Sequence, residues 1–136
     1  MRRARDAVLV AGLVFSAVAA AADFDGTVSL TCTPSAGLDC PADKGKCGKF
    51  ERDPDAKAPP QVRIDFANKT VKTPNLTIPL PIQNSATNDE QLILQGTDSK
   101  YAWSAIVNRQ SGALTIAIAA RKGAYVFFGK CKADSG

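Results

Sequence analysis

Apolar and polar residues alternate with a period of two along most of the chain from Phe24 onward. Successive side chains of a β-strand point to opposite faces, so this alternation predicts strands with one buried and one solvated face. Strands are expected at residues 24–32, 62–66, 76–82, 91–95, 101–108, 113–119 and 124–130. No window of about a dozen residues has the 3.6-residue period of an amphipathic helix. The fold class is therefore predicted to be all-β.

Tight turns are expected between the later strands. Residues 108–112 and 120–123 each end in a glycine, which can adopt the left-handed conformation that closes a short hairpin loop. Asn68, which also tolerates positive φ, is expected to close a third turn. Strands joined in this way pair with their sequence neighbours. The prediction is an antiparallel meander of seven or eight short strands that forms an open barrel or a sandwich.

Pro79 and Pro81 limit the hydrogen bonding of the strand expected at residues 76–82. Proline has no backbone N–H, and residues two apart in an antiparallel strand direct this group toward the same neighbour. One side of the strand therefore lacks donors and is predicted to be a free edge of the sheet. The alternative is that residues 74–81 form an extended loop.

Residues 33–60 differ from the rest of the chain, because they are rich in Pro, Gly, Asp and Lys and show no periodicity. A long polar surface loop is expected here. Loops of this length are uncommon unless they are functional or cross-linked, and this one carries Cys40 and Cys47. Its lysines are interleaved with acidic residues, which indicates a solvated loop rather than a nucleic-acid surface.

The first 22 residues have the three-part pattern of a secretory signal peptide. Arg2, Arg3 and Arg5 precede an apolar stretch, and small residues precede the expected cleavage site after Ala22. The apolar stretch is shorter than the roughly 20 residues of a membrane-spanning helix. We therefore expect a periplasmic or secreted bacterial protein with a single β-domain at residues 23–136 and no membrane span after leader removal. The leader carries half of the formal charge of +4, which leaves about +2 for residues 23–136, so nucleic acid is not an expected partner.

All the cysteines follow the leader: Cys32, Cys40, Cys47 and Cys131. An even number of cysteines in an exported chain predicts disulfides, and three pairings are possible. A bridge between Cys40 and Cys47 would close a small local loop. Cys32 and Cys131 both have the inward phase of their strands, so a second bridge could join the first and last strands across the core. The uneven spacing disfavours a zinc site, and the lack of a C-x-x-C motif disfavours a thiol oxidoreductase.

The chain has no histidine. This absence excludes catalytic triads with an imidazole base, zinc sites with imidazole ligands and histidine pH switches. Asp65 lies on the wet face of its strand, and Asp89 and Glu90 begin another strand. No pattern brings two of these acids to one cleft, as a glycan-directed acid/base enzyme would require. We expect no catalytic residues, no metal and no cofactor.

The hairpin sequence Asn-Arg-Gln-Ser-Gly at residues 108–112 follows Trp103, and Gly129-Lys130-Cys131 lies close to the end of the chain. This combination resembles a pattern in small secreted bacterial β-proteins. Those proteins have a leader, an early strand ending in cysteine, a hairpin of the form Asn-Arg-x-Thr/Ser-Gly and a terminal Gly-x-Cys. The resemblance implies a periplasmic β-domain and no defined activity.

Ser111 and Gly112, together with Lys122 and Gly123 on the next turn, are similar to loop residues of periplasmic C-type lysozyme inhibitors. Such inhibitors insert these loops into their target. They carry a tyrosine three positions after the glycine, where this chain has Thr115. The resemblance implies partner-binding roles for these loop residues.

The expected function is that of a non-enzymatic binding protein stabilised by disulfides, whose partner is a protein, an envelope component or a small ligand. The alternative is a lysozyme-inhibitor-like protein that acts through its hairpin loops. A glycan-directed acid/base enzyme is a second alternative.

Overall fold

The fold of the chain is all-β, as the sequence predicts. In the computed structural model, the residues described are 24–50, 54–55, 57–74 and 76–135, so the expected signal peptide lies outside them. The strands are β1 (Leu30–Pro41), β2 (Gly48–Lys49), β3 (Val62–Asp65), β4 (Thr70–Lys72), β5 (Leu80–Pro81), β6 (Asn84–Thr87), β7 (Gln91–Thr97), β8 (Tyr101–Asn108), β9 (Ala113–Ala120) and β10 (Gly123–Ala133). The described residues contain no helix long and apolar enough to cross a membrane.

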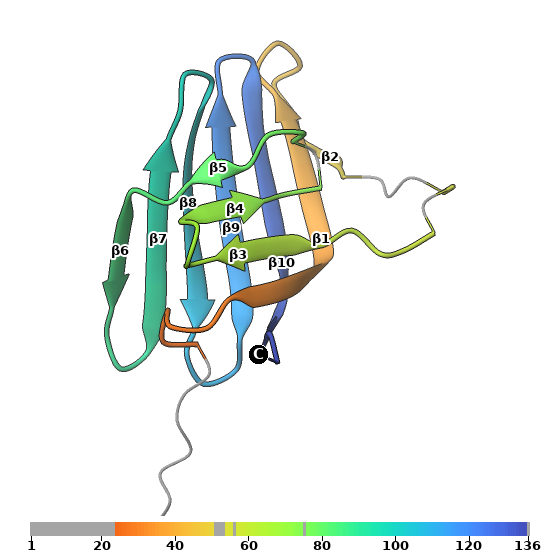
Figure 1. The fold of residues 1–136 in the computed structure, drawn as a ribbon. Coiled ribbons are helices and arrows are strands. Elements are labelled where there is room, and N and C mark those ends of the chain that lie inside the picture. Colours follow the sequence, from red (N-terminus) through yellow and green to blue (C-terminus); the bar gives the residue numbers. More distant parts are fainter. Residues whose placement is uncertain (1–23, 51–53, 56, 75, 136) are drawn as a thin grey trace, which may run out of the picture.

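The strands form one antiparallel sheet that curls into a half-barrel. Its order is β5-β4-β3-β1-β10-β9-β8-β7-β6, and β2 pairs with β1 beside this path. The strands from β7 to β10 belong to the predicted meander, because each pairs with its sequence neighbour. Strand β6, which the sequence analysis did not predict, extends this meander by one strand. Strand β1 pairs with β10, so the first and last strands are neighbours. Figure 1 shows β3, β4 and β5 running across one face of the longer strands.

Strand β1 connects the meander with the crossing strands β3 to β5, because it bends in the middle. Its register with β10 shifts between Pro34 and Ala36, which marks a β-bulge. The part before the bulge pairs with β3, and the part after it pairs with β2. The loop expected at residues 33–60 is therefore wrong in its first part, since β1 continues to Pro41. The polar composition misled the prediction, because the pairing of this segment with β10 uses backbone groups.

The strand expected at residues 24–32 begins only at Leu30. Before it, the backbone and hydroxyl of Thr27 both donate hydrogen bonds to the Asp25 carboxylate, which forms a local turn. The turn expected at Asn68 is present, but the residue with positive φ is Lys69 rather than Asn68. The side chain and backbone N–H of Asn68 instead donate to Asp65.

The strand expected at residues 76–82 is reduced to β5, which pairs with β4 alone. It ends the strand order, so the free edge predicted from Pro79 and Pro81 is confirmed. The Pro81 carbonyl oxygen accepts a hydrogen bond of 3.1 Å from the indole Nε1 of Trp103. A side chain at Gly96 would collide with this same carbonyl, so glycine lets β5 lie directly over β7.

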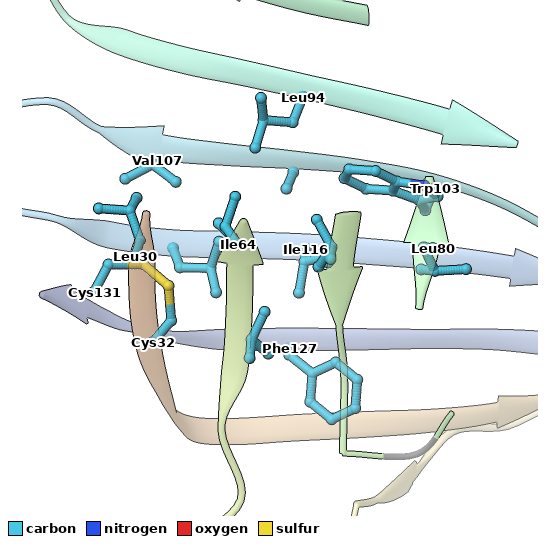
Figure 2. Close-up of a cluster of buried hydrophobic side chains, with 14 of the residues drawn as sticks. Leu30, Cys32, Ile64, Leu80, Leu94, Trp103, Val107, Ile116, Phe127 and Cys131 are labelled. Carbon is cyan, nitrogen blue, oxygen red and sulfur yellow. A yellow bond between two sulfur atoms is a disulfide. The ribbon is translucent and has the colours of Figure 1, made fainter. Parts of the chain in front are cut away.

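The hydrophobic core lies between the crossing strands and the inner face of the meander, as Figure 2 shows. Both disulfides follow the expected pairing, Cys32 with Cys131 and Cys40 with Cys47. The first joins β1 to β10 inside the core, where both cysteines are buried. The buried apolar residues besides these cysteines are Leu30, Val62, Ile64, Val71, Leu80, Leu92, Leu94, Trp103, Ala105, Val107, Leu114, Ile116, Ile118 and Phe127.

Candidate functional site

The two loops compared with lysozyme inhibitors lie at opposite ends of the sheet. Ser111 and Gly112 belong to the turn before β9, and Lys122 belongs to the turn after it, with Gly123 opening β10. A strand of eight residues separates them, which corresponds to about 26 Å at roughly 3.3 Å per residue. The structure therefore does not bring these four residues to one surface (Figure 1). Each loop has to be considered on its own.

The turn that contains Ser111 and Gly112 is occupied by contacts within the protein. Gly112 is buried with φ 74°, and its carbonyl accepts a hydrogen bond from Cys131 N. A Cβ on Gly112 would lie 2.6 Å from Cζ of Phe24, so this ring packs directly on the turn. The Asn108 carboxamide oxygen accepts hydrogen bonds from Gln110 N and Ser111 N. These contacts give the turn a structural role.

Lys122 and Gly123 lie at the other end, where three chain segments meet. The Lys122 carbonyl accepts a hydrogen bond of 2.8 Å from Ala42 N, at the start of the loop closed by the Cys40–Cys47 disulfide. Gly123 faces the Cys40 backbone so closely that a Cβ would collide with its carbonyl oxygen. The end of β1, the disulfide loop and the β9–β10 turn are therefore held together.

Two hollows adjoin each other at this end and share Asp39 and Pro41. One has a volume of about 240 Å³, and the other about 210 Å³. The first is lined by Asp39, Pro41, Lys44, Lys46, Cys47, Gly48 and Lys49. The second is lined by Asp39, Pro41, Ala120, Lys122, Gly123, Ala124 and Tyr125. Asp39 is the only carboxylate in either lining, so neither hollow has the paired acids of a glycosidase.

Basic side chains surround these hollows, and we call this surface the basic end. It consists of Lys44, Lys46, Lys49, Arg121 and Lys122, all of which are exposed. The acids that accompany them among the described residues are Asp39 and Asp43. An ion pair between Arg63 and Asp134, at 3.0 Å, lies elsewhere. The five basic side chains of the basic end outnumber its two described acids, so these residues together carry excess positive charge.

The structure, rather than the sequence, reveals the basic end. The lysines near Cys47 are interleaved with acids along the chain, which predicts a balanced solvated loop. Arg121 and Lys122 come from a turn more than seventy residues later. They give this surface more basic than acidic residues. The sequence contained one signal for this surface, the short loop that the Cys40–Cys47 disulfide closes. Such a loop holds its side chains in a fixed position.

The opposite end of the sheet carries acids and one arginine. Hydrogen bonds from Thr27 lower the pKa of Asp25, and the positive charge of nearby Arg109 lowers it by a smaller amount. Arg109 donates from Nη1 to the Asn88 carbonyl at 2.7 Å and from its backbone N–H to the Glu90 carbonyl. The guanidinium group thereby ties the β6–β7 turn to the β8–β9 turn.

The acids considered for glycan chemistry lie in turns or stabilise them. Asp65 accepts two hydrogen bonds from Asn68, and these bonds lower the pKa of its carboxyl. Asp89 and Glu90 lie in the β6–β7 turn, where Asn88 accepts hydrogen bonds from Glu90 N and Gln91 N. Asp98 caps the β7–β8 turn in the same way. An Asn or Asp at the start of each hairpin was the sequence signal for these turns.

Comparisons of the chain with models of protein families, with curated proteins and with solved structures found no match. Within the described residues, no three Cys, Asp or Glu side chains gather as ligands for a metal ion. The basic end is the surface where exposed charge, defined hollows and a covalently fixed loop coincide.

Proposed function

We propose that the chain is an exported, non-enzymatic binding protein whose basic end binds an anionic polymer of the cell envelope. The observation that carries this proposal is that two adjoining hollows are lined by four lysines, Lys44, Lys46, Lys49 and Lys122. Arg121 precedes Lys122 in the same turn and is exposed. The two disulfides are compatible with an oxidising compartment outside the cytoplasm. The shared chemistry of the ligand is a chain of phosphate or carboxylate groups.

The fixed position of the basic side chains supports the proposed binding surface. The Cys40–Cys47 disulfide closes the loop that carries Lys44 and Lys46, and the Ala42–Lys122 hydrogen bond joins that loop to the neighbouring turn. Fixing the positions of the charged groups before binding reduces the ordering cost of association. The ammonium groups are strongly hydrated point charges, which suit anions without demanding one bidentate geometry.

The position of the loops argues against a lysozyme-inhibitor mechanism that uses both hairpins. Ser111 and Gly112 lie at the end of the sheet that carries Asp25 and Arg109, far from Lys122. A single lysozyme cleft would have to reach two opposite ends of the domain. Polymer binding at the basic end does not require the turn that contains Ser111 and Gly112, because both segments of the basic end lie side by side.

The test measures binding of two polyanions, inorganic polyphosphate and polygalacturonate, to the oxidised exported protein by calorimetry. Neutral dextran is the ligand control. The two polyanions distinguish phosphate from carboxylate as the preferred group. We expect binding that weakens as salt is added, because exposed charges are screened within about 8 to 10 Å at physiological ionic strength.

The deciding variant replaces Lys44, Lys46 and Lys122 by glutamine. Its matched control replaces Lys72, Lys130 and Lys132, which are exposed on β4 and β10, so both variants lose the same charge. The first should bind at least tenfold more weakly than the control, whereas a change in net charge alone would weaken both equally. Equal affinities of the two variants, or no binding to either polyanion, would overturn the proposal.

A further inference from the structure

One face of the sheet carries a broad apolar area without charge. Side chains alternate along β7, β8, β9 and β10, and those that do not enter the core point to the side opposite β3–β5. We call this the outer face. It is the far side of the sheet in Figure 1, and no strand of the described part covers it. Its larger apolar side chains are Leu38, Ile93, Ile106, Val126 and Phe128.

The strand register shows that these residues form continuous rows. Ile93 pairs with Ile106, Ile106 with Thr115, and Thr115 with Phe128, which makes one row across four strands. A second row contains Gln95, Ser104, Ala117, Val126 and Leu38. A third row of small residues contains Ala102, Ala119 and Ala124.

Three large apolar side chains in these rows are exposed to solvent to an extent that is high for apolar residues. Ile106 is 43% exposed, Phe128 42% and Leu38 36%. Neither charged groups nor Trp or Tyr occur in the three rows. The lysines on this side lie at the margins, with Lys49 paired to Leu38 at the end of the second row and Lys130 beyond Phe128. Monomeric proteins rarely expose contiguous apolar areas above a few hundred Å².

We propose that the outer face is the interface of a homodimer, in which two copies of the chain pack sheet against sheet. Strands about 4.8 Å apart and rows about 7 Å apart along each strand give a projected area on the order of 500 Å². This area is smaller than the ~800 Å² per partner of a standard interface. We therefore expect a weak, reversible dimer.

The chemistry of the face favours a second copy over other occupants. Because Lys49 and Lys130 lie only at the margins of the outer face, a two-fold arrangement can place its uncharged rows against each other without burying a charge. The alanines of the third row leave room for the large side chains of a facing sheet at the usual ~10 Å separation. A membrane-binding face would be expected to carry Trp or Tyr at its rim, and these rows have neither. This inference does not depend on the proposed polyanion binding.

The experiment is sedimentation equilibrium of the oxidised exported protein over a hundredfold range of concentration. The first variant is Thr115→Lys, at the centre of the first row, where the side chain is exposed and contributes nothing to the core. Ile106→Lys is the second variant. Its matched control is Ile78→Lys, because Ile78 is 66% exposed but lies before β5, away from the outer face.

We expect the original protein and Ile78→Lys to dimerise and both outer-face lysine variants to bind their partner copy at least tenfold more weakly. Circular dichroism of Thr115→Lys should show the same β-sheet spectrum as the original protein, which separates loss of the dimer from unfolding. A protein that is monomeric throughout the range contradicts the proposal. So does a dimer that Thr115→Lys leaves unchanged. Binding of the monomer to phosphatidylcholine vesicles, abolished by Thr115→Lys, would assign the face to lipid instead.

Discussion

The carbonyl oxygen of Pro81 accepts a hydrogen bond of 3.1 Å from the indole Nε1 of Trp103. This bond connects β5, the free edge of the sheet, to β8 in the middle of the meander. Several strands separate β5 from β8 in the sheet order. The two strands nevertheless touch directly, because β5 crosses the inner face of the meander (Figure 1). The Pro81–Trp103 contact therefore helps to hold the half-barrel closed over its core.

Replacing Trp103 by Phe tests this contact. The ring remains apolar, but the Pro81 carbonyl loses its donor, and leaving a part-buried acceptor unpaired costs about 1 to 3 kcal/mol. Urea denaturation should show a loss of unfolding free energy in that range. No loss would mean that the hydrogen bond does not support β5.

Replacing Gly96 by Ala should displace β5 more directly. A Cβ at this position collides with the Pro81 carbonyl oxygen and crowds Trp103 Nε1. Overpacking of this kind costs about 1 to 3 kcal/mol. Trp103 is the only tryptophan of the chain, so its emission should shift toward that of a solvated indole. Gly48→Ala is the control, because no atom lies within 4 Å of its added Cβ, and an equal loss there would refute the account.

The two disulfides should contribute unequally to stability. Cys32 and Cys131 are separated by 99 residues, and Cys40 and Cys47 by seven. The loop-closure treatment assigns about 4 to 5 kcal/mol to the long loop and about 2.5 kcal/mol to the short one. Paired Cys→Ala variants, compared by urea denaturation, should follow this order, with the loss at Cys32 and Cys131 increased by the core cavity. Similar losses would show that loop length does not govern the effect.

Acid should weaken the β3–β4 turn through Asp65. Hydrogen bonds from Asn68 lower the pKa of this carboxyl below its ordinary 3.8 in the folded protein. The stabilisation is therefore fully present above pH 3.8 and is lost as the pH falls through the lowered pKa. In Asn68→Ala, the pKa of Asp65 should rise toward 3.8, as measured by NMR titration of its carboxyl carbon. An unchanged pKa would assign the shift to another group.

Strands β7 to β10 of the meander were predictable, because each buries one face and exposes the other to solvent. Strand β6 was missed, because all four of its residues are exposed. Strand β8 occupies residues 101–108 as expected, and β9 and β10 extend beyond the predicted limits by only a few residues. The disulfide pairing was predictable for a related reason, since Cys32 and Cys131 share the inward phase of β1 and β10. Periodicity reports which face a side chain occupies, and this information favoured both results, although it left three disulfide pairings open.

Features that depend on backbone pairing or on distant segments were not predictable. The second half of β1 has a polar sequence and is held by its backbone pairing with β10. The basic end requires Lys122 to lie beside the disulfide loop, which no local pattern encodes. The separation of Ser111 from Lys122, in contrast, already followed from the predicted meander, because successive hairpin turns lie at opposite ends of their strands.

The central claim, that the basic end is the binding surface, is tested most directly by amide chemical shifts during titration with inorganic polyphosphate. We predict that the perturbed amides cluster at residues 39–49 and 120–125, which line the two hollows, while those of the 108–112 turn stay unchanged. A saturating response at the 108–112 turn, without one at residues 39–49, would contradict the claim.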